Sequence, residues 1–160
     1  MRFPLALLFV FVALSLGQAE ERPLFGLSEI RREATEGTTP MTLSYRGQST
    51  TYQVEKEMVL TDQDVIGANV VDQESEIALE ILLNKRGAKA FEDLTRRTME
   101  NRGQVAILVE GKLISAPSVR VVITGGTLQV IGDFSREDAV RIAGSINAAW
   151  KRRGVEKPSR

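Results

Sequence analysis

Residues 76–101 read EIALEILLNKRGAKAFEDLTRRTMEN, and this stretch decides the fold. Its first half alternates with period two, which places four large apolar side chains on one face of a strand, against a core. Asn84 can then cap a helix, because its side chain can accept from backbone N–H groups that the first turn leaves free. The spacing predicts a helix over residues 85–101. The strand face consists of Ile77, Leu79, Ile81 and Leu83, and the helix stripe of Ala88, Phe91, Leu94, Thr95 and Met99.

The sequence after this helix predicts more strands and a second helix. Residues 104–109 indicate a buried strand, which returns over residues 112–114 after the Glu110-Gly111 turn. Residues 119–123 and 127–131 are expected to pair around Gly125-Gly126. Ser135 and Asp138 form an S-x-x-D capping box that opens a final helix up to residue 150. Its apolar stripe is Ala139, Ile142, Ala143, Ile146 and Trp150.

The sequence before residue 76 is less regular. Residues 41–45 and 50–60 are extended in pattern, but residues 20–46 as a whole are charged and turn-rich. We interpret residues 20–46 as a linker or N-terminal extension, with a short helix near residues 28–32. The folded domain is expected at residues 47–150, and residues 151–160 as a basic flexible tail. The fold class is α+β, with an antiparallel sheet and two helices packed on one face.

The N-terminus has the pattern of a secretory signal peptide over residues 1–19. Arg2 precedes an apolar run at residues 3–14, and Gly17 and Ala19 supply the small residues of a cleavage site. The run is shorter than the roughly 18 residues of a membrane span, although an uncleaved anchor is the alternative. We therefore expect a periplasmic or secreted chain that starts at Glu20 and has no integral membrane segment after cleavage.

The composition argues against catalysis and against nucleic-acid binding. Cysteine and histidine are absent, which removes thiol chemistry and the usual general base. The formal net charge is zero, so no bulk attraction toward nucleic acid exists. We expect no enzyme, no cofactor and no nucleic-acid partner.

Three residue groups could nevertheless suggest chemistry, and each has a plainer interpretation. A cluster of acidic residues resembles a cation site but lacks the spacing of a calcium loop. A Ser115–Lys112 dyad is conceivable, but a strand lysine ordinarily points to water. Residues 151–153 could contact lipid headgroups or an acidic partner, although a solvated tail is favoured. The acidic residues are Asp62, Asp64, Asp72, Glu74 and Glu76.

An ordered series of short motifs resembles the head subdomain of the first periplasmic domain of the SecD/SecDF protein-export family. The series covers about residues 52–147, and no single motif in it is specific by itself. The motifs are residues 52–61 (YQVEKEMVLT), 83–84, 87–91 and 94–95, then 105–108, 111–112 and 115–117, and finally 123–126, 131–134 and 137–139. The resemblance implies contact with secreted polypeptide, whereas the family's transmembrane proton-linked residues have no counterpart in the sequence after Ala19.

Two functions follow as expectations. The favoured one is a non-catalytic binding module for unfolded or secreted polypeptide, with the export machinery as a further partner. The alternative is an envelope structural or interaction domain with a folded protein partner and no role in translocation. A sheet edge can bind an extended chain through backbone hydrogen bonds, whatever the sequence of that chain. The candidate surface is Lys112, Ile114, Ser115, Pro117, Thr124, Gly125 and Gly126.

Overall fold

The structure is a computed structural model that describes residues 23–73 and 76–154. Its elements, in chain order, are β1 (Phe25–Arg31), β2 (Thr38–Tyr45), β3 (Gln48–Glu55), β4 (Leu60–Thr61), η1 (Asp62–Asp64), β5 (Val65–Gln73), β6 (Glu76–Leu83), α1 (Lys85–Glu100), β7 (Val105–Val109), β8 (Lys112–Ser115), β9 (Thr127–Ile131) and α2 (Arg136–Arg152). The predicted signal peptide lies outside the described residues.

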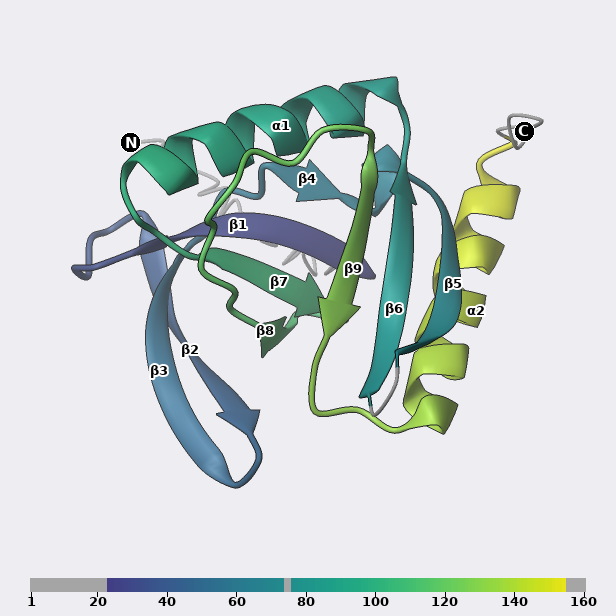
Figure 1. Cartoon of the computed structure of the whole chain (residues 1–160), viewed down its shortest axis with the longest axis horizontal. Helices are drawn as coiled ribbons and strands as arrows, with labels where there is room; N and C mark the ends of the chain where they lie inside the picture. Colours follow the sequence, from purple (N-terminus) through teal and green to yellow (C-terminus); the bar gives the residue numbers. More distant parts are fainter. Residues whose placement is uncertain (1–22, 74–75, 155–160) are drawn as a thin grey trace, which may run out of the picture.

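The strands form two antiparallel sheets (Figure 1). The larger sheet has the order β2-β3-β1-β7-β8, with β4 also paired to β1, and the smaller has the order β5-β6-β9. Helix α1 packs on β4 and β6, and α2 packs along β5. The predicted α+β class, with antiparallel pairing and two helices, is confirmed, although the strands are divided between two sheets rather than gathered in one.

The main hydrophobic core combines residues from both sheets and both helices. Phe25 and Leu27 of β1, Leu79 and Ile81 of β6, and Leu94 of α1 have no exposed surface. The predicted strand face and both predicted helix stripes belong largely to this core, including Phe91 and Ile146. A second, smaller cluster packs on the opposite face of the larger sheet, beneath the β2–β3 hairpin. It contains Val54, Ala106, Leu108 and Leu113.

The predicted caps of both helices are present. The side chain of Asn84 accepts a hydrogen bond of 2.8 Å from the Gly87 N–H. At α2, Ser135 and Asp138 form the reciprocal capping box. The hydrogen bonds from Ser135 lower the pKa of Asp138, because they stabilise its charged form.

The predicted linker was wrong over residues 25–31. These residues form β1, a strand that pairs with β3, β4 and β7, and no helix occurs near residues 28–32. The four residues Phe25 to Ser28 are all buried, so both faces of the strand are covered. A local pattern of alternation cannot reveal a strand that is buried on both faces.

The predicted pairing of residues 119–123 with 127–131 was also wrong. Strand β9 pairs with β6, whereas residues 119–123 run as an irregular segment beside α1. The Ile123 N–H donates to the Thr95 hydroxyl over 3.1 Å, and the Leu83 N–H donates to the Gly126 carbonyl over 2.8 Å. Gly125 and Gly126 have φ of +96° and +73°, so the reversal that they permit directs β9 to the edge of β6.

Candidate functional site: a groove between two sheet edges

The larger sheet curls until its two outer strands, β2 and β8, approach each other. Four successive antiparallel pairings separate them, so β2 and β8 run in the same direction. In the described part of the chain no strand pairing joins β2 to β8. The sheet is thus an unclosed barrel, and a groove lies along the gap.

The groove has a wide part and a narrow part, which meet at Ile114. The wide part has a volume of about 980 Å³, between residues 39–42 and 44 of β2 and residues 110–114, with Phe134 and Arg141 at its side. The narrow part has a volume of about 380 Å³. Its lining is largely apolar or uncharged and consists of Leu43, Tyr45, Gln48, Thr50, Tyr52, Ile114, Ser115, Ala116, Pro117 and Ile131.

The wide part carries charges of both signs. Glu55, Glu110, Asp133 and Asp138 are acidic, whereas Lys56, Lys112 and Arg141 are basic. The nearly balanced lining gives the groove no strong preference for a cationic or an anionic ligand. Its Pro40, on the edge strand β2, has no N–H to offer to a partner strand.

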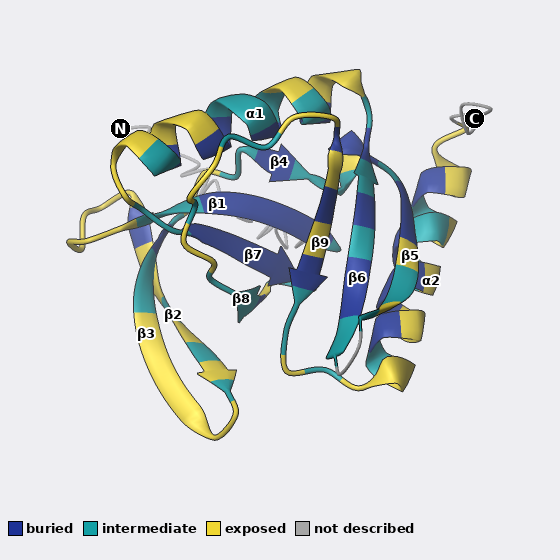
Figure 2. Cartoon of the chain, viewed as in Figure 1, coloured by how far each residue is buried: buried dark blue, intermediate teal, exposed yellow. Residues whose placement is uncertain are grey.

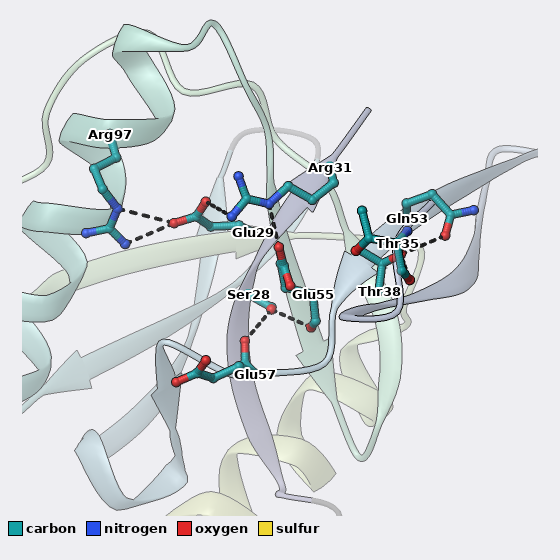
Figure 3. Close-up of polar contacts among 9 residues, drawn as sticks. All are labelled: Ser28, Glu29, Arg31, Thr35, Thr38, Gln53, Glu55, Glu57 and Arg97. Atoms are coloured by element: carbon teal, nitrogen blue, oxygen red, sulfur yellow. Dashed lines mark hydrogen bonds and ion pairs between the residues drawn. The ribbon is translucent and has the colours of Figure 1, made fainter. Parts of the chain in front are cut away.

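The base of the β2–β3 hairpin is held by polar contacts with β1, as Figure 3 shows. The buried Ser28 hydroxyl points at two carbonyl oxygens, 2.7 Å from that of Glu55 and 2.8 Å from that of Glu57. Glu29 pairs with Arg97 of α1 at 2.9 Å, and Arg31 pairs with the Glu55 carboxylate. The hairpin is therefore fixed at its base, whereas residues 46–51 towards its tip are exposed (Figure 2).

The structure divides the predicted binding surface. Lys112, Ile114, Ser115 and Pro117 all line the groove. Thr124, Gly125 and Gly126 do not line it; they form the turn before β9, where a Cβ on Gly126 would lie 2.9 Å from that of Ala88. The sequence interpretation missed the side of the groove that the β2–β3 hairpin forms, because residues up to 46 were assigned to a linker. The alternation of Met41, Leu43 and Tyr45, whose side chains are half-buried, was the signal that could have identified it.

The groups considered for other chemistry do not converge. Asp62, Asp64, Asp72 and Glu76 each pair with a different arginine, and Glu74 lies outside the described residues. Within residues 23–73 and 76–154, no three metal-binding side chains come together. Lys112 and Ser115 stand three residues apart on β8 with a bulge between them, opposite Val109 and Ile107 of β7. Lys112 lines the wide part of the groove, whereas Ser115 lines the narrow part.

Part of the predicted basic tail is ordered. Helix α2 continues to Arg152, and the next residue contacts η1 and β5. The Arg153 guanidinium donates to the Asp62 carboxylate over 3.1 Å and to the Val65 carbonyl over 3.0 Å. The prediction of a flexible tail was therefore wrong for residues 151–153, and residues 155–160 lie outside the described residues.

The fold and the groove define an α+β domain of two antiparallel sheets and two helices whose larger sheet leaves a gap between its edges. Residues 38–149 match the family described as SecDF, P1 head subdomain, and the chain belongs to that family. This confirms the resemblance that the sequence motifs indicated.

Individual relatives are subunits of the protein translocase. The chain is 36% identical over 91 residues to the SecD subunit of Acidaminococcus fermentans, covering 56% of this chain and 21% of that protein. It is 31% identical over 127 residues to SecD of Rickettsia bellii, covering 74% of this chain and 24% of that protein. The chain thus spans a fifth to a quarter of the length of these curated relatives.

Two solved structures share the fold. One, described as SecDF in a super-membrane-facing form, has a TM-score of 0.62 at 24% identity and covers 80% of this chain and 19% of that one. The other is described as a membrane component SecDF that enhances protein export. It has a TM-score of 0.60 at 22% identity and covers 80% of this chain and 63% of that one. Among the residues that the structure describes here, no helix has the length and apolar character needed to cross a bilayer.

Proposed function

We propose that this chain is a non-catalytic, extracytoplasmic binding module of protein export that holds extended polypeptide in the groove between β2 and β8. The observation that carries the proposal is the gap between the edges of β2 and β8, which no strand fills within residues 23–73 and 76–154. An extended segment can add to such an edge through backbone hydrogen bonds, which do not depend on its side chains. This suits clients that are unfolded and varied in sequence.

The lining of the groove supports the same function. Its narrow part offers apolar and aromatic surface from both walls, including Leu43, Tyr52 and Ile131. Alternate side chains of an extended segment can pack on such surface while its backbone bonds to an edge. Since the charges of the wide part nearly balance, binding should be weak, broad in sequence preference and little affected by salt.

Family membership supports a role in export and a periplasmic location. The SecDF structure with the same fold is described as enhancing protein export. The sequence pattern at residues 1–19 fits that location, and cleavage should leave Glu20 as the first residue. Mass spectrometry of the native protein checks this, and an intact Met1 in the membrane fraction would contradict it.

The binding test is an NMR titration of the domain with unfolded peptides of equal apolar content and scrambled order. Shifts should be confined to residues lining the groove and should persist in high salt. A peptide with alternate N-methylated amides should bind much more weakly, because it lacks donors for an edge.

Leu43→Thr in the groove should weaken binding, whereas Val121→Thr should not. Val121 is 64% exposed and lies outside the groove, which makes it a matched control. No shifts at about 1 mM peptide, or shifts abolished by salt, would contradict the proposal. One stoichiometric folded partner recovered by crosslinking in the periplasm would favour the envelope-interaction alternative.

A further inference from the structure

Both walls of the groove are carried by β-hairpins whose turns share an unusual feature. The β2–β3 turn is Arg46-Gly47, and the β7–β8 turn is Glu110-Gly111. In each, the first residue has a positive φ, 49° at Arg46 and 50° at Glu110. Two-residue hairpin turns of this kind favour Asn, Asp or Gly at that position, because other side chains are strained there. The presence of a long charged residue at this position in both turns therefore suggests that its side chain makes a contact that offsets the strain.

Each charged turn residue forms an ion pair with an element outside its own hairpin. The Arg46 guanidinium lies 2.6 Å from the Glu76 carboxylate at the start of β6, in the other sheet. Glu76 also accepts a hydrogen bond of 3.3 Å from the Tyr45 hydroxyl, and the guanidinium lies 5.1 Å from the centre of the Tyr45 ring. On the opposite wall, the Glu110 carboxylate lies 2.7 Å from the Arg141 guanidinium of α2.

These contacts stand at the two ends of the groove. Tyr45 lines the narrow part, and Glu110 and Arg141 line the wide part. The exposed outer half of the β2–β3 hairpin, residues 46–51, makes this contact with β6 at its tip. The strained turn residues thus occupy the positions from which a charged side chain can fix each wall against the rest of the domain.

We infer that Arg46–Glu76 and Glu110–Arg141 are anchors that set the separation of β2 and β8, and so the access of an extended polypeptide to the groove. The inference rests on the proposed function for its ligand. Arg46, Glu76, Glu110 and Arg141 are positioning residues here. Release of the Arg46–Glu76 anchor leaves the base of the β2–β3 hairpin intact, since the contacts of Ser28 and Arg31 hold it. Release of the Glu110–Arg141 anchor leaves the pairing of β7 with β1 intact. In each case the wall beyond these contacts can move.

The test replaces each turn residue by one that suits the turn but lacks the ion pair, Arg46→Asn and Glu110→Asn. Asn tolerates positive φ better, so the variants should melt at or above the wild-type temperature. The chain has no cysteine, which allows spin labels at Ser49→Cys and Lys112→Cys, one on each wall. Electron paramagnetic resonance should then show a broader distance distribution in both variants. Arg96→Asn, which removes the Arg96–Glu92 pair of α1, should leave the distribution unchanged.

Peptide dissociation gives the second readout. It should be faster in both variants, by about two- to fivefold, the size of effect that an exposed ion pair can have. Glu76→Gln is the back-up for the first anchor, because it leaves the turn unchanged. Unaltered distances in Arg46→Asn, Glu76→Gln and Glu110→Asn would overturn the inference even if the peptide binds. A wild-type domain that binds no peptide would instead refute the proposed function, while the distances still decide whether the anchors exist.

Discussion

Asp64 illustrates how packing defines the role of a residue that the sequence presents only as acidic. It is 1% exposed, and its Oδ2 atom accepts a hydrogen bond of 3.1 Å from the Thr61 N–H. A guanidinium nitrogen of Arg86 lies 2.6 Å from the other carboxylate oxygen, Oδ1, and forms an ion pair with it. The geometry of this contact is not that of a hydrogen bond. Asp64 also packs against the first turn of α1 at Gly87, where the backbone of the helix approaches it closely.

We predict opposite effects from alanine at two helical glycines. A Cβ on Gly87 would lie 2.8 Å from the Cβ of Asp64, so Gly87→Ala should destabilise the domain by about 1–3 kcal/mol. Gly144 of α2 is exposed and has open space around it, so Gly144→Ala should stabilise by about 0.4–1 kcal/mol. Urea unfolding of both variants gives the comparison. Equal effects would mean that helix propensity, rather than the contact at Asp64, governs position 87.

A pH effect is expected at the capping box of α2. Hydrogen bonds from Ser135 hold the pKa of Asp138 below its ordinary value, so the unfolded chain binds a proton more readily than the folded chain. The contribution of Asp138 to stability is therefore complete above about pH 4, the ordinary value for an aspartate, and falls as the pH drops through the folded pKa. Unfolding free energies between about pH 2 and 6 should change less steeply in Asp138→Asn. Ser135→Ala should reduce the pH dependence of the unfolding free energy in the same way. If both variants keep the pH dependence of the wild type, Asp138 does not contribute to it through the capping box.

At the scale of elements, α2 closes one edge of the smaller sheet. The Asn147 side chain accepts from the Ala68 N–H over 2.9 Å and donates to the Ala68 carbonyl over 2.8 Å, as a neighbouring strand would. Arg153 bonds to the Val65 carbonyl on the same strand, β5. An unpaired sheet edge can pair with other chains. The side chains of Asn147 and Arg153 bond to the outer edge of β5 and so block such pairing. Among the residues that the structure describes, no strand pairs across the gap between β2 and β8, which distinguishes this gap as a candidate site.

Loss of the Asn147 amide should open this edge. Asn147→Ala leaves a buried N–H and a carbonyl of Ala68 without partners, and should cost about 2–4 kcal/mol. Hydrogen exchange at the Ala68 amide should accelerate more than exchange in β7. Asn69→Ala is the matched control, because Asn69 is exposed on the same strand and bonds to Glu80; it should cost about 0.5 kcal/mol or less. Equal costs for the two variants would contradict the role of Asn147.

At the scale of the whole molecule, the folded unit is longer than the family match. The match starts at Thr38, whereas β1 lies before it and stands between β3 and β7 in the larger sheet. Phe25 and Leu27 of β1 have no exposed surface and belong to the main core. Without β1, the strands on either side of it lose their pairing, and the unclosed barrel cannot form.

We therefore predict that residues 38–160 alone do not fold, whereas residues 23–160 do. Circular dichroism and the dispersion of amide signals in NMR spectra are the measurements. The shorter chain should lack a cooperative thermal transition. If it unfolds cooperatively and shows a dispersed spectrum, β1 is an addition to the domain rather than a part of its core.

The sequence by itself determined the features that depend on neighbours along the chain. The alternation of residues 77–83, the caps at Asn84 and Ser135 and the stripes of both helices are local patterns of polarity and hydrogen bonding, and the structure has all of them. The ordered motifs also predicted the family correctly. Lys112, Ile114, Ser115 and Pro117, proposed from the sequence as part of a binding surface, all line the groove, and their role in binding stays a prediction.

Only the tertiary structure decided which strands pair and where a groove remains. Strand β1 is buried on both faces by segments that are distant in the sequence. Strand β9 pairs with β6 because that edge of β6 was available. A local sequence pattern predicts neither outcome. The groove joins residues about 70 positions apart, and it exists because five strands curl without closing. Propensity acts over a few residues, whereas burial and pairing depend on the whole folded chain.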